Sequence, residues 1–268
     1  MESGGFTLVT KGKGARRRKG DIRTTVLKET PGRGVIDVDK AILKIKQAMV
    51  DLQASPFFDG LCRDLLPLVG GCDVIWCFGL GHLGECVTAR YQVALLLVIR
   101  DQLGVTSGGV FVNDPIFYSE EVEILQKLRL NVALENIECK LRCEARTLLF
   151  LPHCPKQLVN NLLYSNWRPE KLINLVIFAN SFSGTFERSR RRELEQGAGL
   201  LLKVVERGLV KEVPVKNNFK FEDIFNDSSI HSFQNLEVVE EDFWKVEEPQ
   251  YGEEDTEFLR KSSSSGGH

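Results

Sequence analysis

The stretch CFGLGHLG at residues 77–84 contains three glycines with the spacing G-x-G-x-x-G. In dinucleotide-binding proteins this spacing forms the turn between a buried strand and a helix. Gly79 would permit the tight turn, Gly81 would let the backbone approach a pyrophosphate, and Gly84 would allow the helix to pack closely on the strand. Backbone N–H groups at the start of the following helix would hold an anion. These three glycines are therefore candidate cofactor-binding residues.

Small polar or titratable residues follow three further apolar runs that we expect to be strands. They are Asp114 after the second run, His153 and Cys154 after the fourth, and Asn180 and Ser181 after the fifth. Because the carboxyl ends of parallel strands meet at one edge of a sheet, we expect these residues to line a crevice together with the glycine turn. Asp114 would accept a ribose hydroxyl, although it lies 30 residues beyond the last glycine, whereas the usual interval is about 20.

The chemistry of these residues leaves the ligand open between a nucleotide, another small anion and haem. A His153 nitrogen or a Cys154 thiolate would be able to ligate haem iron, but the proline that follows Cys154 equally suits the first turn of a helix. Adjacent side chains on extended backbone point apart, so His153 and Cys154 do not form a dyad, and we assign no catalytic residue. Zinc sites use spacings such as C-x-x-C, which Cys77, His82 and Cys86 lack, so we expect no other metal site.

Apolar runs alternate with helical patterns through the middle of the chain. We predict strands at 73–78, 109–113, 131–135, 146–151 and 173–179. We predict helices at 85–103, 119–129, 155–166 and 187–207. The strands are nearly all apolar, which is typical of strands covered by helices on both faces. The pattern therefore indicates an α/β protein with a doubly wound, mainly parallel, Rossmann-like sheet and helices on both faces.

Further elements are expected on either side of this alternating region. Apolar residues at helical spacing predict a helix that begins after an aspartate cap, Asp37 or Asp39, and a second helix over 57–66. We expect both helices to lie against one side of the sheet. Segments 209–216 and 228–234 would add edge strands.

Composition divides the chain into one domain and two tails. Residues 1–34 form a basic tail, residues 35–245 a single α/β domain, and residues 246–268 an acidic, Ser/Gly-rich tail. We expect both tails to be disordered, because they carry too little apolar surface to offset the entropy of ordering. The net charge of -2 argues against bulk attraction to nucleic acid. This leaves RRRK at 16–19 as a candidate nucleic-acid or nuclear-import patch.

Cysteine usage and the lack of long apolar segments indicate where the protein works. Its seven cysteines are an odd number without a framework spacing, which suits a reducing compartment. The first residues lack the apolar region of a secretory signal, and the longest near-apolar run, 93–99, is far shorter than the ~20 residues of a membrane span. We expect a cytoplasmic protein that does not bind membranes, and that enters the nucleus if RRRK acts as an import signal.

Five further segments follow the glycine turn in order. They are DPIF at 114–117, LPHC at 151–154, NNLLYSNW at 160–167, ANSF at 179–182 and FNDSSIHSF at 225–233. Together they resemble the SRR-like domain of the sensitivity-to-red-light-reduced family in its mammalian type, over about residues 36–245. The resemblance implies a regulatory protein with protein partners, tied to circadian-clock control and to haem biosynthesis and homeostasis. It implies no particular enzymatic reaction.

Two classes of function remain open from the sequence. The first is a non-enzymatic regulator whose α/β domain presents a partner surface and is gated by a small anionic or haem-like ligand. The second is an enzyme that uses a nucleotide or adenosyl cofactor at GLGHLG. A fold alone does not decide between them, because function depends on the site. We favour the regulator.

Overall fold

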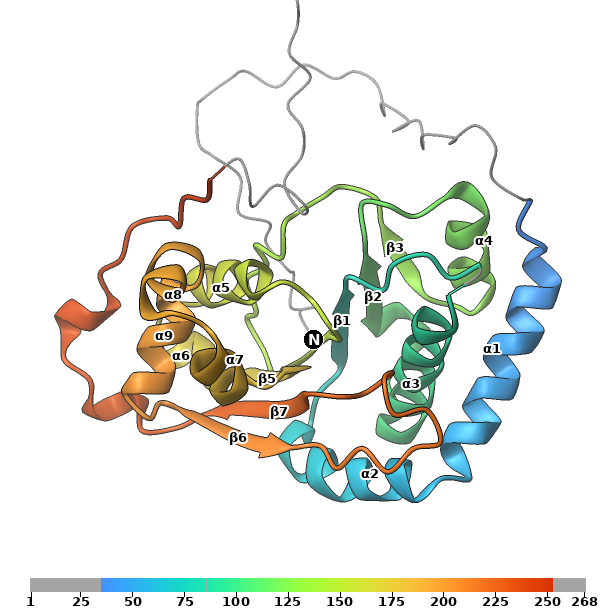
Figure 1. Cartoon of the computed structure of the whole chain (residues 1–268), viewed down its shortest axis with the longest axis horizontal. Helices are drawn as coiled ribbons and strands as arrows, with labels where there is room; N and C mark the ends of the chain where they lie inside the picture. Colours follow the sequence, from blue (N-terminus) through green and yellow to red (C-terminus); the bar gives the residue numbers. More distant parts are fainter. Residues whose placement is uncertain (1–34, 85, 253–268) are drawn as a thin grey trace, which may run out of the picture.

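The computed structural model describes residues 35–84 and 86–252. The expected basic tail at 1–34 and most of the expected acidic tail lie outside the described residues. Within the described part, one sheet separates two groups of helices (Figure 1). The strands are β1 (Val74–Phe78), β2 (Val110–Asn113), β3 (Asn131–Ala133), β4 (Thr147–Leu151), β5 (Leu175–Asn180), β6 (Val210–Pro214) and β7 (Ser228–Phe233).

The sheet has the order β3-β2-β1-β4-β5-β7-β6. Strands β1 to β5 pair in parallel, and β7 is antiparallel to both of its neighbours, β5 and β6. The chain runs outward from β1 to β3 and then returns to place β4 on the other side of β1, so the winding changes direction between β1 and β4. This confirms the doubly wound, mainly parallel, Rossmann-like α/β sheet. The point between β1 and β4 is where such folds bind ligands.

The central strands are buried on both faces, as their apolar sequences predict. In β1, Ile75 and Cys77 belong to one hydrophobic core, and Trp76 and Phe78 to the other. Side chains alternate between the two faces of a strand, so each core takes every second residue. The two cores explain why the strand sequences read as continuous apolar runs rather than as alternating ones.

Four helices cover the first face of the sheet. They are α1 (Val38–Gln53), α2 (Pro56–Val69), α3 (Val87–Leu103) and α4 (Ser119–Lys127). The Asp37 side chain caps α1 by accepting a hydrogen bond from the N–H of Lys40. Helices α1 and α2 lie on one side of the sheet, but α1 packs on α3 and α4 and forms an outer layer (Figure 1).

Five helices of the described part lie on the second face. They are α5 (Lys156–Ser165), α6 (Pro169–Leu172), α7 (Phe182–Arg188), α8 (Arg191–Gly197) and α9 (Gly199–Glu206). The prediction of one helix over 187–207 is wrong, because the backbone is extended at Ser189 and leaves helical geometry again at Ala198. Glycines on both sides of Ala198 weaken a continuous helix there by about 1 kcal/mol each relative to alanine.

The last described residues also differ from the sequence-based expectation. Segments 209–216 and 228–234 do form strands, β6 and β7. Of these two, β6 lies at an edge of the sheet, whereas β7 lies between β5 and β6. Residues 246–252, which we assigned to the acidic tail, lie on the domain, where Val246 and Tyr251 pack against the second core. Among the described helices none is long and apolar enough to cross a membrane.

A buried charge tests the placement of the central sheet. Val176 in β5 is fully buried, so Val176→Asp places an unpaired charge in the core and lowers the free energy of unfolding by about 3–5 kcal/mol. The matched control is Val50→Asp, because Val50 is 57% exposed on α1 and the same change there costs at most about 0.5 kcal/mol. Urea unfolding of both variants measures the difference. Equal stability of the two variants would refute the placement of β5.

Candidate functional site

The glycine turn follows β1 directly, as the motif predicts. Gly79 and Gly81 have φ angles of 68° and 70°, in the left-handed region that favours glycine. A Cβ atom on Gly79 would lie 2.5 Å from the sulfur of Cys154, and one on Gly84 would lie 2.6 Å from Ile36. Gly84 thus allows the segment before α1 to pack on the turn. Two of the three glycines therefore make room for other parts of this chain.

The backbone N–H groups of the turn donate hydrogen bonds to carboxylates of the same chain. The N–H of Gly81 donates to Oδ2 of Asp114 at 2.8 Å. The N–H groups of Leu83 and Gly84 donate to Oε1 of Glu121 at 2.6 and 3.2 Å. In a dinucleotide site these N–H groups would face a pyrophosphate. Here internal carboxylates occupy that position.

Glu121 also holds the beginning of α4 against the turn. Its Oε2 accepts a hydrogen bond from the N–H of Tyr118 at 2.9 Å and lies 3.1 Å from Nδ1 of His82. The His82 ring in turn stacks on Tyr118 with 4.2 Å between the ring centroids. The carboxylate of Glu121 is fully buried, so it requires these partners to offset its desolvation. Sequence reasoning missed this residue.

Asp114 lies at the carboxyl end of β2, where we expected it, but its carboxylate binds protein groups. Besides the N–H of Gly81, the N–H of Ile116 donates to its Oδ1 at 3.1 Å. Burial raises the pKa of the Asp114 carboxyl, although these two N–H groups oppose the effect. A site with two internal carboxylates at the turn repels a further anion.

His153 and Asn180 are brought together at the ends of β4 and β5. The backbone of His153 has a φ angle of 54°, and its N–H donates to Oδ1 of Asn180 at 2.9 Å. The Nε2 atom of His153 lies 2.9 Å from the carbonyl oxygen of Ile224. This contact holds the imidazole to the segment that leads into β7.

Cys154 fills the point between β1 and β4 where the winding changes direction. Its thiol is buried and donates to the carbonyl oxygen of Phe78 at 3.2 Å, beside Gly79. Burial raises the pKa of the Cys154 thiol far above its usual range, and the charge of Asp114 raises it further. Cys154 is therefore a protonated thiol at neutral pH, whereas a metal ligand must be a thiolate.

Ser181 begins the helix after β5. Its hydroxyl oxygen accepts a hydrogen bond from the N–H of Gly184 at 2.8 Å, which makes it the N-cap of α7. Its own N–H donates to the carbonyl oxygen of Asp227 at 2.7 Å. These contacts account for Ser181 as a structural residue.

Two hollows lie on the carboxyl edge, and each is lined by some of the residues that the sequence predicted for the site. The β1–β2 hollow has a volume of about 170 Å³ and includes Gly79 and Asp114 in its wall. The β4–β5 hollow has a volume of about 270 Å³ and includes Cys154 and Asn180. Pro155 lines both of them. Gly81, Gly84, His153 and Ser181 are not among the residues that line these two hollows.

The β4–β5 hollow differs from its neighbour in charge. Lys156 lines it, no described Asp or Glu does, and the Thr185 and Ser189 side chains complete the polar part of the wall. In contrast, the β1–β2 hollow is lined by Asp114 and Glu138. Within the described ranges, no group of three or more His, Cys, Asp or Glu side chains is placed to hold a metal ion.

A half-buried carboxylate that the sequence did not reveal lies in the middle of β6. Glu212 pairs with His231 of β7 in the sheet register, and Oε1 of Glu212 is 3.6 Å from Nε2 of the fully buried His231. Burial alone would raise the pKa of Glu212. The side chains of His231 and Ser181 and the N–H of Ser183, all of which face the carboxylate, outweigh burial and hold this pKa well below its usual range.

No motif in the sequence links these carboxylates to their partners. Glu121 is the third residue of α4 and forms a capping box with Tyr118, a position at which an acidic residue is common. The amides that it binds in the glycine turn lie 37 and 38 positions earlier in the chain. Only the folded chain brings them together.

The fold and its glycine turn define a Rossmann-like α/β protein. Residues 62–232 match the SRR1 domain family. These residues make up more than half of the chain, so the chain belongs to this family. The family includes the plant protein whose name refers to reduced sensitivity to red light, and membership fits a regulatory role.

Three curated relatives show how far the similarity extends. The SRR1-like protein of Mus musculus is 38% identical over 132 residues, which are 49% of this chain and 53% of the mouse protein. The SRR1-like protein of Drosophila melanogaster is 25% identical over 216 residues, 78% of this chain and 75% of the fly protein. Protein SENSITIVITY TO RED LIGHT REDUCED 1 of Arabidopsis thaliana is 29% identical over 105 residues, 39% of this chain and 38% of the plant protein. The match thus spans about half of the mouse relative.

Two solved structures share the general course of the chain. One is an SAH-bound methyltransferase of Podospora anserina, with a TM-score of 0.39, 13% identity, and coverage of 76% of this chain and 91% of that one. The other is a protein of Corynebacterium glutamicum, with a TM-score of 0.40, 13% identity, and coverage of 73% and 90%. These scores are too low to transfer any function.

Removal of the Glu121 carboxylate tests its role in the turn. Glu121→Ala leaves three backbone N–H groups without their acceptor and opens a small cavity, so the free energy of unfolding falls by about 3–5 kcal/mol. Glu123→Ala on the same helix is the control, because Glu123 is 54% exposed and its removal costs at most about 0.5 kcal/mol. Chemical denaturation measures both. A fully stable Glu121→Ala variant would show that the turn does not depend on this carboxylate.

The lowered pKa of Glu212 predicts a pH dependence of stability. A glutamate whose folded pKa lies below its unfolded value of 4.5 contributes stability that is fully present above that value and is lost as the pH falls through the folded pKa. Glu212→Gln removes this contribution, so the stability difference from wild type is constant near neutral pH and shrinks below pH 4.5. Denaturation curves between acidic and neutral pH measure it. The control is Glu195→Gln, at an exposed position. A difference that grows in acid would contradict the assignment.

Proposed function

We propose that this chain is a non-enzymatic regulator that binds protein partners and is gated by a small anionic ligand in the β4–β5 hollow. The observation that carries the proposal is the occupation of the glycine turn by Asp114 and Glu121. A pyrophosphate at that turn would have to displace both carboxylates or approach them closely, and either change is unfavourable. The turn then serves chain reversal and packing rather than dinucleotide binding.

The charge of the β4–β5 hollow supports an anionic ligand there. Lys156 lines the hollow, and no described carboxylate pairs with its ammonium group. The Nδ2 atom of Asn180 donates to no described residue, while its Oδ1 is already held by His153. A wall that has a cation and neutral donors but no carboxylate side chain favours a ligand with a phosphate or carboxylate group.

The link of the family to haem homeostasis enters the proposal without direct iron binding by this chain. Cys154 is a buried, protonated thiol, and His153 is held to the carbonyl oxygen of Ile224. Both would have to leave their partners to ligate iron. We therefore assign control of haem biosynthesis and of the circadian clock to protein partners of this chain, rather than to iron bound by these two residues.

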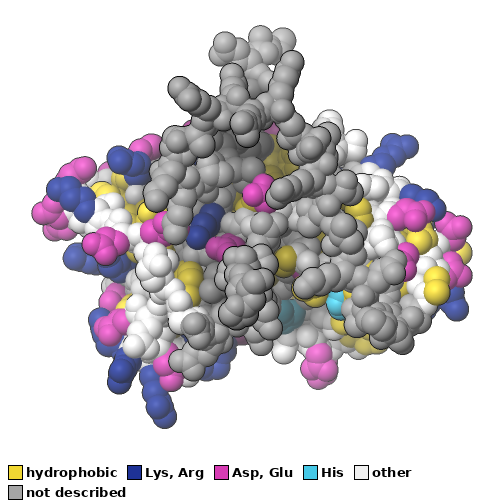
Figure 2. Space-filling view, turned by 90° about the horizontal axis from the view of Figure 1, so that it is seen from above, with side chains coloured by type: hydrophobic (Ala, Val, Ile, Leu, Met, Phe, Trp, Pro, Cys, Tyr) yellow, Lys and Arg dark blue, Asp and Glu magenta, His cyan; other side chains and the backbone are white. Residues whose placement is uncertain are grey.

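The distribution of charge on the surface supports the proposal of protein partners. Figure 2 shows Lys and Arg side chains beside Asp and Glu side chains on both flanks of the visible face. Arg188 pairs with Asp227, and Arg191 pairs with Glu195 and Glu206. A nucleic-acid-binding face usually has a continuous basic stripe, whereas mixed charges on these flanks favour protein partners of mixed charge. We place this work in the cytoplasm, and in the nucleus if RRRK acts as an import signal.

A second candidate function follows from the β1–β2 hollow. It lies beside Gly79, and Asp114 and Asn136 are in its wall. An adenosyl compound without a phosphate needs no free N–H group at the turn, and its ribose would find the Asp114 carboxylate as an acceptor. An enzyme that uses an adenosyl cofactor would bind it here.

Titration with defined probes distinguishes the two candidates. For the regulator, calorimetry shows binding of pyrophosphate to wild type, and Lys156→Glu weakens it at least tenfold, or about 1.4 kcal/mol. Lys211→Glu, at an exposed position of β6, is the charge-matched control and leaves the affinity unchanged. Gly81→Val also leaves it unchanged, because the ligand does not contact the turn.

Further probes show which outcome contradicts the proposal. Binding of NAD or pyrophosphate that is lost in Gly81→Val would place the anion at the glycine turn and refute the regulator as stated. Binding of S-adenosylhomocysteine that falls at least tenfold in Asp114→Asn, about 1.4 kcal/mol, would favour the adenosyl enzyme. A haem absorbance spectrum that changes in His153→Ala or Cys154→Ala would show direct iron ligation.

A further inference from the structure

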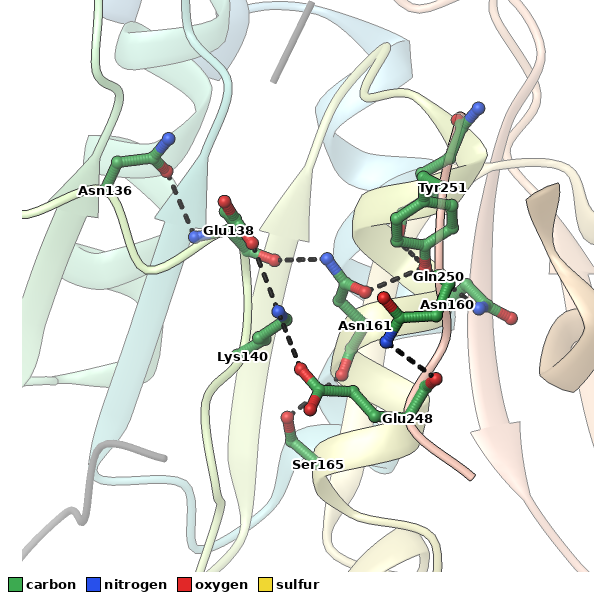
Figure 3. A network of polar contacts seen from close by, with 10 residues as sticks. Asn136, Glu138, Lys140, Asn160, Asn161, Ser165, Glu248, Gln250 and Tyr251 are labelled. Atoms are coloured by element: carbon green, nitrogen blue, oxygen red, sulfur yellow. Dashed lines mark hydrogen bonds and ion pairs between the residues drawn. The ribbon is translucent and has the colours of Figure 1, made fainter. Parts of the chain in front are cut away.

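The segment after the 3-10 helix at Glu241–Trp244 forms a strap over the second face of the sheet. We use the term C-terminal strap for residues 245–252, which have neither helical nor strand structure. The strap ends against α5, where the Tyr251 hydroxyl accepts a hydrogen bond from Nδ2 of Asn160 at 3.0 Å (Figure 3). The same hydroxyl lies 2.8 Å from Oδ1 of Asn161 and 3.3 Å from the carbonyl oxygen of Gln157. The Tyr251 hydroxyl thus anchors the end of the strap to α5.

The strap is also connected to the loop that precedes β4. Nδ2 of Asn161 donates to the carbonyl oxygen of Glu138 at 2.9 Å. Nζ of Lys140 lies 3.2 Å from the carboxylate of Glu138 and 3.1 Å from that of Glu248 in the strap (Figure 3). One side-chain network therefore links Tyr251, Glu248 and the loop at 138–140.

This loop depends on such contacts for its conformation. Glu138 and Cys139 have φ angles of 50° and 59°, in the left-handed region that costs a non-glycine residue about 1–2 kcal/mol. Both residues line the β1–β2 hollow. Release of the strap would remove two supports of this wall, the Glu248–Lys140 ion pair and the ordered Asn161 side chain.

The surroundings of Tyr251 do not accommodate a phosphate. Two of the three groups at its hydroxyl are oxygen acceptors, Oδ1 of Asn161 and the carbonyl oxygen of Gln157. Glu247 and Glu248 precede Tyr251, and residues 253–255 have the sequence EED. A phosphate of about -2 charge without a proton to donate would be repelled by the oxygen atoms of Asn161 and Gln157. An acidic sequence around a tyrosine is also a charge pattern by which kinases select substrates.

We propose that Tyr251 is a phosphorylation site whose modification releases the C-terminal strap and loosens the wall of the β1–β2 hollow. A tyrosine kinase transfers the γ-phosphoryl group of ATP to the Tyr251 oxygen. The O–P bond to ADP breaks, the new O–P bond to tyrosine forms, and the hydroxyl proton is released. The strap reaches the kinase through local opening, because it has no regular secondary structure to unfold. The proposal holds whether or not either hollow binds a ligand.

Phosphorylation of the full chain tests this directly. A purified tyrosine kinase that prefers acidic sequences, with ATP, adds one phosphate to wild type at Tyr251, as mass spectrometry shows, and Tyr251→Phe lacks that phosphate. Tyr164→Phe is the control, since Tyr164 also lies on the second face, in α5, and is half-buried. It retains phosphorylation at Tyr251.

Hydrogen exchange reads out the release of the strap. The N–H of Glu138 donates to Oδ1 of Asn136, and the N–H of Lys140 donates to the carbonyl oxygen of Ile137. After phosphorylation both N–H groups exchange at least tenfold faster, which corresponds to about 1.4 kcal/mol of opening free energy. Tyr251→Glu gives the same direction of change. Amides of β4 and β5 keep their protection, which shows that the domain is still folded.

Three outcomes would overturn the proposal. The first is a chain phosphorylated at Tyr251 whose exchange at 138–140 matches that of wild type. The second is a kinase that modifies a peptide of residues 244–258 but never the folded chain, because the strap then does not open. The third is a failure of the kinase to modify even this peptide, which would remove the sequence argument.

Discussion

The carboxylate of Glu121 joins the glycine turn after β1 to the beginning of α4. It is fully buried and binds the N–H groups of Leu83, Gly84 and Tyr118. These bonds fix the turn after β1 to the beginning of α4. A buried carboxylate that satisfies backbone N–H groups stabilises them in the way that a bound phosphate would. The chain therefore supplies internal carboxylates to the backbone N–H groups of its glycine turn.

Polar groups along the rest of the carboxyl edge are likewise satisfied by other groups of the same chain. The Cys154 thiol fills the point between β1 and β4, the Ser181 hydroxyl caps α7, and Asn180 holds the backbone of His153. Groups with the chemistry of a site thus bind one another. What they leave open are two hollows of opposite charge on either side of Pro155.

Membership of the SRR1 domain family fits a regulatory role. The C-terminal strap adds a connection between the surface and the β1–β2 hollow, because Glu248 and Tyr251 contact the loop and the helix beside it. A segment held by a few side-chain contacts has a lower opening free energy than the sheet. Regulation by partners or by modification can therefore act on the strap without unfolding the domain.

The sequence by itself determined the sheet and its five parallel strands, since apolar runs between helical patterns admit little else. It also placed Gly79, Asp114, Cys154 and Asn180 at the carboxyl edge, because each lies within three residues of the end of an apolar run. It did not determine which groups these residues contact. The bonds from the turn to Glu121 join positions 37 and 38 residues apart, and the pairing of Glu212 with His231 depends on the register of β6 and β7.

The docking of residues 246–252 also came from tertiary packing, whereas the break of the predicted helix at Ala198 has a local cause in the glycines on both sides of it. Local patterns in a sequence report which face of an element is apolar. They do not report which distant N–H group a buried carboxylate will find, because that depends on how the elements pack in three dimensions.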